Sequence, residues 1–200
     1  MSTYAPSVDR SSPQFNGLRM AADEFFQIPD DGYNYELIDG IVMMTPSPTP
    51  KHQAVLMEIA TQIALYLRTN PVGQALPEID VHLGEGLAGG DLVYRPELVF
   101  MRSERLPQIE DKIVGAPDLV VEIISRGSRR FDSETKKRDY EHFGVREYWL
   151  IDPERQSMTF YRLEGDRFAE TPPTGDGFSC QVIPGFTLDL ARVRKAFQPW

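Results

Sequence analysis

The stretch that decides the fold is GAPDLVVEIISRGSRRFDSETKKRDYEHFGVREYWLID, residues 115–152. It opens with an apolar run over residues 118–125, of the kind found in central strands that are covered on both faces. A helix is expected from about residue 133 to residue 143, and a second strand over residues 147–152. Helices interleaved with apolar central strands predict an α/β or α+β architecture.

The flanking sequence adds further elements to this core. Residues 35–44 predict an N-terminal β-hairpin, because Asp39-Gly40 suits a tight two-residue turn. Residues 51–68 predict a long helix with one apolar stripe, capped by Thr49 and with Pro50 in its first turn. The other expected elements are a short helix over 20–28, strands over 79–83, 97–101 and 158–163, weaker strands in the tail, and a last helix around 190–197.

Composition limits the class of protein. With 200 residues, 41% of them hydrophobic, the chain has enough apolar material for one core. No apolar stretch approaches the roughly 20 residues that span a bilayer, so we expect no membrane partner. The polar start, broken by Pro and Gly, predicts a disordered leader over residues 1–17 before one domain over 18–200. A single cysteine, Cys180, allows no intramolecular disulfide and indicates a cytoplasmic protein.

The charge is unevenly distributed. The net charge of −9 disfavours non-specific binding to nucleic acid, because the phosphate backbone attracts positive surface. Between residues 126 and 138, however, six basic residues stand against two acidic ones. Such a cluster is as consistent with a solvated helix face as with a phosphate contact, so charge alone does not identify the partner.

Glu122 is the residue most informative about function, because it lies in the middle of the apolar run LVVEII. A glutamate in a buried strand costs several kcal/mol unless it is paired or bound to a cation. Lys136 offers a partner, since it shares a helix face with Tyr140 and Phe143 and therefore points toward the sheet. A structural Glu122–Lys136 ion pair and a reaction centre both remain open at this point, as does a strand whose acidic face is exposed.

Further acids begin the central strands. Glu97 opens RPELVF, and Asp118 lies four residues before Glu122 on the same face of their strand. Gathered carboxylates repel one another unless a divalent cation holds them, and oxygen ligands are those that Mg²⁺ prefers. A lysine among the acids favours phosphodiester cleavage over glycoside hydrolysis. Glu36 and His52 are weaker candidates, since a surface-strand glutamate and a satisfied helix-end histidine are the favoured interpretations of these two residues.

Three stretches of the sequence resemble those of a known protein family. The runs YELIDGIVMMTPSPTPKHQ (35–53), RPELVF (95–100) and GAPDLVVEIISRGSRRFDSETKKRDYEHFGVREYWLIDP (115–153) are similar to the Uma-type restriction endonucleases of the PD-(D/E)XK nuclease superfamily. The resemblance covers roughly residues 18–165. It implies a restriction-endonuclease-like core, with a central mixed β-sheet flanked by helices, and hydrolysis of DNA that depends on Mg²⁺, for which Mn²⁺ can substitute.

The resemblance also implies roles for individual residues. Carried over by position, Glu97 and Glu122 bind the metal, Lys136 is the catalytic lysine moved onto the following helix, and Glu36 and His52 match further site positions. Asp118 is the aspartate of a second Pro-Asp pair, and either Asp118 or Glu36 would assist the metal through water. DNA contacts fall to residues of the basic cluster: Arg126, Arg129 and Arg130. Two positions depart from the family pattern: Glu97 replaces an aspartate, and the usual Ser-Pro-Ser after the strand is replaced by Ser125-Arg126-Gly127-Ser128.

Two classes of function follow. The leading hypothesis is a metal-dependent DNA endonuclease in which Lys136 positions or activates the attacking water. The alternative is a catalytically silent binding or assembly module that keeps the nuclease fold, an alternative that the glutamate at position 97 and the acidic charge support. A homodimer is a third expectation, with the apolar tail strands as its candidate interface.

Overall fold

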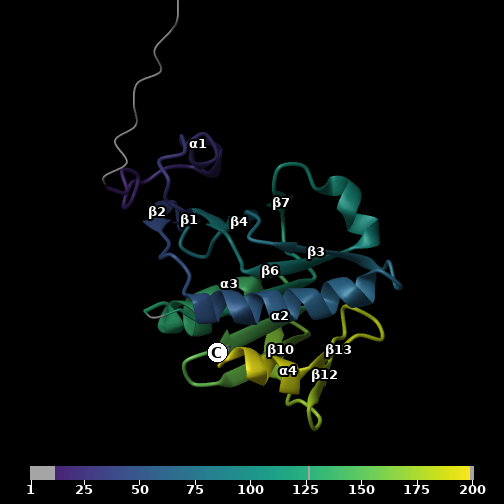
Figure 1. Cartoon of the computed structure of the whole chain (residues 1–200). Coiled ribbons are helices and arrows are strands. Elements are labelled where there is room, and N and C mark those ends of the chain that lie inside the picture. The colour runs from purple at the N-terminus through teal and green to yellow at the C-terminus, as the bar shows by residue number, and fades with distance from the viewer. Residues whose placement is uncertain (1–11, 126, 199–200) are drawn as a thin grey trace, which may run out of the picture.

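The computed structural model describes residues 12–125 and 127–198, and a six-stranded mixed sheet lies at its centre (Figure 1). Only β8 and β9 run parallel, and the other neighbours in this sheet are antiparallel. This sheet and its flanking helices confirm the expected architecture. The strands, in spatial order, are β11 (Arg167–Glu170), β10 (Ser157–Glu164), β9 (Glu147–Asp152), β8 (Leu119–Ile123), β6 (Leu98–Arg102) and β3 (Gly73–Pro77).

The central strands are apolar because both faces of the sheet are covered. Every residue of β8 and β9 is buried. Val121 and Trp149 join one hydrophobic core, whereas Val120 and Tyr148 join another on the opposite face. A strand buried on both faces needs no alternation of polar residues, which explains the continuous run that marks β8 in the sequence.

The first face is covered by α2 and by the C-terminal part of the chain (Figure 1). Helix α2 (Pro50–Leu67) begins as expected, with the hydroxyl of Thr49 accepting a hydrogen bond from the His52 amide at 3.2 Å. Its apolar stripe is buried against the sheet. The C-terminal elements packed on this side are β12 (Gly177–Ser179), β13 (Thr187–Asp189) and α4 (Leu190–Ala196).

The second face is covered by a five-stranded sheet and by a helical segment after β8. The helical segment is a π-helical turn, η2 (Phe131–Lys136), that continues into α3 (Lys137–His142). The second sheet has the order β2 (Ile41–Met44), β1 (Tyr35–Ile38), β5 (Asp91–Tyr94), β4 (Val81–Glu85) and β7 (Ile113–Val114).

The hairpin of β1 and β2 has two unlike faces. Leu37 and Val42, opposite each other in the register, are fully buried in a small core with α1 (Ala22–Phe25). Glu36 and Met43, the next opposed pair, lie on the other face. The turn forms at Asp39-Gly40 as expected, with positive φ angles of 49° and 73°. The hairpin therefore presents Glu36 toward the interior of the molecule.

Several elements differ from the expectations. The first helix is shorter than residues 20–28, and the expected uniform helix over 133–143 is divided into η2 and α3. The strands β3, β5 and β7 and the 3₁₀ helix η1 (Ser103–Gln108) were not predicted. Of the expected leader, residues 1–11 lie outside the described part, while Phe15 packs edge-on against Tyr35 with the ring centroids 5.9 Å apart. Among the described residues, no helix has the length and apolar character needed to cross a membrane.

Candidate active site

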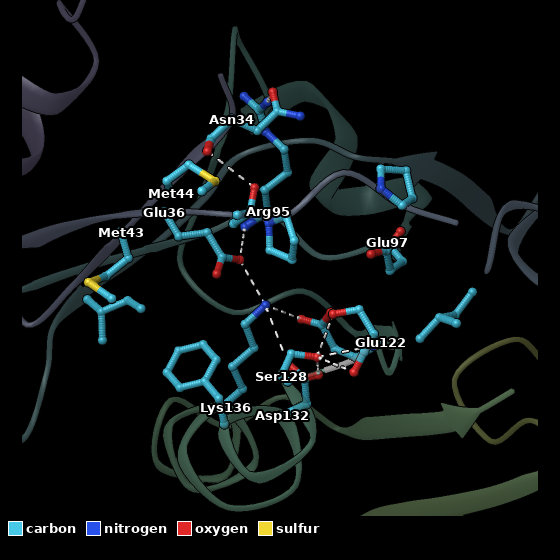
Figure 2. Close-up of a pocket in the computed structure, with 18 of the residues that line it drawn as sticks. Asn34, Glu36, Met43, Met44, Arg95, Glu97, Glu122, Ser128, Asp132 and Lys136 are labelled. Carbon is cyan, nitrogen blue, oxygen red and sulfur yellow. Dashed lines mark hydrogen bonds and ion pairs between the residues drawn. The ribbon is translucent and has the colours of Figure 1, made fainter. Parts of the chain in front are cut away.

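A cavity of about 620 Å³ opens where the two sheets meet (Figure 2). Its walls come from the β1–β2 hairpin, the loop before β6, the end of β8 and the turn η2. These segments lie far apart in the sequence, so the cavity is a product of the fold rather than of one motif. Five of the residues expected at the site line it: Glu36, His52, Glu97, Glu122 and Lys136.

Lys136 stands between two carboxylates. Its Nζ donates hydrogen bonds to Glu36 Oε1 at 2.8 Å and to Glu122 Oε1 at 3.0 Å, and it lies 4.0 Å from Asp132 Oδ1. Figure 2 shows the lysine reaching from η2 toward the hairpin, with Glu122 at its side. All four side chains are at most 6% exposed. The expected contact between Glu122 and Lys136 is therefore present, and Glu36, which lies in the other sheet, also contacts Lys136.

The π-helical turn gives this cluster its geometry. A π turn admits an extra residue into a helix, and such turns are frequent at functional sites. Here Asp132 and Lys136, both on η2, are buried and directed toward the same group of side chains. Asp132 accepts a 2.6 Å hydrogen bond from the Ser128 hydroxyl. Tyr140, on α3, donates to Glu122 Oε1 at 2.8 Å and so holds that carboxylate from the helix side.

The cluster carries more acid than base. Burial raises the pKa of Glu122, and the neighbouring carboxylates raise it further, although Lys136 opposes the shift. Burial likewise raises the pKa of Asp132. Burial alone would lower the pKa of Lys136, but Glu122, Glu36 and Asp132 outweigh it and raise that pKa, so the lysine is an ammonium. Three buried carboxyl groups thus face one ammonium, and the raised pKa values of Glu122 and Asp132 show that burial opposes their ionisation. An additional cation would stabilise their charged forms.

Glu97 forms a second pair with His52. Glu97 lies just before β6, and its Oε1 is 3.0 Å from His52 Nε2. The same ring nitrogen is 3.0 Å from the carbonyl oxygen of Ile123 at the end of β8. Burial opposes the charged form of His52, but the hydrogen bond and the charge of Glu97 outweigh it and raise the pKa of His52. His52 therefore joins the start of α2 to Glu97 and to the end of β8.

Arg95 fixes Glu36 through the main chain. The Arg95 amide donates to Glu36 Oε1 at 2.9 Å. The guanidinium is turned away and held by Asp80, at 2.7 and 3.1 Å, and by Asn34 at 3.0 Å. Lys136 and this backbone donor thus orient the Glu36 carboxylate together, and both donate to its Oε1.

The structure does not bring Asp118 to the cavity. Asp118 precedes β8, whereas Glu122 lies near its other end, about 13 Å along the strand at the usual rise per residue. Its carboxylate accepts from the Arg102 amide at 3.0 Å and from Arg105 at 3.3 Å. Equal strand parity places two residues on one face but does not place them at one site, so the expected shared metal site of Asp118 and Glu122 is not formed.

The expected DNA-contacting arginines have varied surroundings. Arg129 is paired with the buried carboxylate of Asp152, 2.8 Å from its Nε and 2.7 Å from its Nη2. Arg130 is exposed and pairs with Glu134 at 3.0 Å. Arg126 lies outside the described residues.

Sequence reasoning missed several members of the cluster. Asp132, Ser128 and Arg95 were not singled out, and Tyr140 was expected only as an aromatic residue on the helix face that points toward the sheet. Asp132 precedes Lys136 by four residues, a spacing that could have indicated a shared helix face. The roles of Ser128 and of the Arg95 amide depend on tertiary placement, for which the sequence carries no local signal.

Comparison with known proteins now adds to this geometry. The model of the Uma2 family, described as "Putative restriction endonuclease", matches residues 22–191. The chain belongs to the Uma2 family. A solved structure described as "a putative nuclease belonging to DUF820 from Anabaena variabilis ATCC 29413" is similar, with a TM-score of 0.73 and 21% identity, over 89% of this chain and 99% of that one. At this identity the likeness shows the fold. No curated protein matches the chain.

The Uma2 fold implies a divalent metal, and the cavity offers oxygen donors for one. In the described part of the chain, no three His, Cys, Asp or Glu side chains form a ready-made metal site. Mg²⁺, however, commonly takes only one or two carboxylates and keeps several waters. Glu97 and Glu122 both line the cavity, and Glu122 lies in a cluster with two further carboxyl groups, Glu36 and Asp132. These residues fit a hydrated divalent cation.

Proposed function

We propose that this Uma2 protein is a divalent-metal-dependent DNA endonuclease that cleaves phosphodiester bonds in the cavity. The observation that carries the proposal is the buried cluster of Glu36, Glu122 and Asp132 around one ammonium, Lys136, at the wall of a cavity that also holds Glu97. Burying four ionisable side chains lowers the stability of the fold, and such clusters are frequent at functional sites. Family membership supports the same activity.

The residues divide the work of hydrolysis. Glu97 and Glu122 would hold the metal, which when bound supplies charge stabilisation at the phosphate and lowers the pKa of a coordinated water. Lys136 is an ammonium and therefore does not accept a proton; it orients the attacking water and offsets negative charge that develops on the phosphate. Glu36 and Tyr140 keep the lysine and Glu122 in place. His52 positions Glu97.

A second candidate is a nuclease-fold module without catalysis. Each carboxylate needed for metal binding already has a protein partner: Glu122 has Lys136 and Tyr140, and Glu97 has His52. In that case the cluster would serve as a structural ion network. The two candidates differ in whether DNA is hydrolysed and whether a metal binds.

The test is hydrolysis of labelled plasmid and oligonucleotide DNA with Mg²⁺, with Mn²⁺ and with chelator. The parent should cleave only with metal. Glu122→Gln should lower the rate by at least about 10²-fold, because it removes a charged group at the reaction centre while keeping its size. Glu164→Gln, at the exposed end of β10, should match the parent, so that a loss of cleavage confined to Glu122→Gln excludes a contaminating nuclease. Equal rates for the parent and Glu122→Gln would refute the assignment.

A further inference from the structure

The wall of the cavity opposite Lys136 is apolar. On the hairpin, Glu36 and Ile38 point to one face, and their cross-strand partners Met43 and Ile41 point to the same face. All four line the cavity. The hairpin face that carries a carboxylate of the proposed active site is therefore otherwise built from Ile38, Ile41 and Met43.

This face is left open, unlike the other side of the same hairpin. Leu37 and Val42 are fully buried, whereas Met43 is 43% exposed and Ile38 and Ile41 are half-buried. The wall continues along the chain through Met44, which is 38% exposed, and through Pro46 and Pro48. Figure 2 shows Met43 and Met44 along the hairpin beside Glu36. One face of the hairpin is therefore buried in a hydrophobic core, whereas the other face is also largely apolar but lines the cavity.

The position of this wall restricts what can touch it. Met43 is directly opposite Glu36 in the register, with Cβ atoms expected about 5 Å apart, and Glu36 is bonded to Lys136. If a scissile phosphate lies at Lys136 and Glu122, the nearest extended apolar surface of the substrate, beyond the sugar, is the face of the adjoining base. Methionine side chains adapt to flat and irregular surfaces, and every base offers a π face.

A paired base would not fit the same wall. In a duplex the faces of the bases are stacked, and only their edges are available for polar recognition. Two polar groups of the wall, Arg95 and Asn34, are bonded to each other, and Arg95 also to Asp80. The chain also carries a net charge of −9, which disfavours the two phosphate backbones of a duplex more than the one backbone of a single strand.

We propose that the hairpin face of Ile38, Ile41 and Met43 binds an unpaired nucleobase next to the scissile phosphate. The preferred substrate is accordingly single-stranded or locally unpaired DNA. This inference rests on the proposed function, because that function places the phosphate at Lys136.

The test measures binding and hydrolysis separately. Fluorescence anisotropy in Ca²⁺, which fills oxygen sites with longer and looser bonds, compares four probes: a single strand, its duplex, the duplex with one bulged base, and the same bulge with an abasic nucleotide. The single strand and the bulge should bind at least about fivefold more tightly than the duplex, and the abasic bulge should lose this gain. Cleavage of the same probes in Mg²⁺ reports on the nuclease assignment independently.

Matched variants connect the preference to the hairpin. Met43→Gln should remove the preference for unpaired DNA, whereas Met57→Gln, an equal change on a methionine that is 66% exposed on α2, should keep it. Met43→Trp should increase the preference, a gain that misfolding would not produce. Equal affinity for single strand and duplex, or a preference that survives Met43→Gln, would overturn the inference. Absence of cleavage would instead remove the nuclease proposal, with the binding ratios still deciding whether the hairpin holds a base.

Discussion

Lys136 determines the charge balance of the site. It is bonded to two buried carboxylates and lies 4.0 Å from a third, with 6% of its side chain exposed. Removing one partner of a buried ion pair leaves an uncompensated charge, which commonly costs about 3–5 kcal/mol. A structural role and a catalytic role therefore both predict that loss of the lysine destabilises the protein, and only catalysis separates them.

Lys136→Met should lower stability by about 3–5 kcal/mol and abolish DNA cleavage. Lys136→Arg retains the positive charge and should restore part of the stability, but it should leave cleavage at least about 10²-fold below the parent, because the planar fork cannot occupy the position of the ammonium. Urea unfolding and the rate of oligonucleotide cleavage measure the two effects. Full cleavage by a folded Lys136→Met protein would show that the lysine is structural.

We expect substitution of Asp118, unlike substitution of Glu122, to lower stability without lowering the rate of DNA cleavage. Asp118→Asn weakens the contacts with Arg102 and Arg105 and should reduce stability by about 1–3 kcal/mol. Because this carboxylate lies outside the cavity, the rate of DNA cleavage per folded molecule should not change. Thermal unfolding and a cleavage assay on the same preparation check both parts. A folded Asp118→Asn protein without activity would return Asp118 to the metal site.

At the scale of elements, the hairpin must be held against β5 for Glu36 to reach Lys136. Leu37 pairs with Val93 on β5, and the Gly40 amide donates to the Asp91 carbonyl at 2.9 Å. Gly90 lies directly against the turn, since a Cβ there would be 2.2 Å from the carbonyl carbon of Asp39. A side chain at Gly90 would therefore move the hairpin.

Gly90→Ala should cost about 1–3 kcal/mol through overpacking and should lower cleavage further than this loss of stability explains, because Glu36 moves with the turn. Gly115→Ala is the matched control: that glycine has a φ of 85° and open space around its Cβ position, so the alanine adds only backbone strain. Stability and cleavage of both variants should be compared. If Gly90→Ala cleaves DNA like Gly115→Ala, the hairpin does not position the site.

Local patterns predicted those elements whose folding is decided locally. The turn at Asp39-Gly40, the Thr49 cap of α2 and the apolar strand β9 were all found in the sequence and lie where expected. The short edge strand β7 and the strand β5 carry no such signal, because they are defined by their partners. The π turn η2 escaped prediction for a related reason, since helical periodicity does not report one inserted residue.

The site residues that could be predicted are those with a charged side chain in an apolar stretch of sequence. A glutamate inside an apolar strand and a lysine on an apolar helix face both indicated burial, and Glu122 and Lys136 do meet. The contributions of Asp132 and the Arg95 amide remained hidden, because only the packing of η2 and of the hairpin places them in the cluster. Asp118 was wrongly placed at the site for a different reason. An even spacing along a strand shows that two residues share a face of the sheet, but not that they lie at the same end of it.

On the scale of the whole molecule, two sheets meet at a cavity to which each contributes acid. Glu122 comes from the six-stranded sheet and Glu36 from the five-stranded one, while Glu97 lies in the loop between β5 and β6, which connects the two sheets. This arrangement gathers carboxyl groups in a chain that already carries a net charge of −9. A bound cation would stabilise the assembled fold as well as the reaction, so metal binding connects stability with function.

The central claim, that these acids form a cation site rather than a self-contained ion network, is tested most directly by thermal unfolding with and without millimolar Mg²⁺ or Mn²⁺. Metal at 100 times its Kd adds about 2.7 kcal/mol, which for a chain of this size raises the midpoint by about 5–10 °C. If these acids form a cation site, the parent should show this rise and Glu122→Gln should not. No rise in either protein, or an equal rise in both, would contradict this claim and favour the silent module.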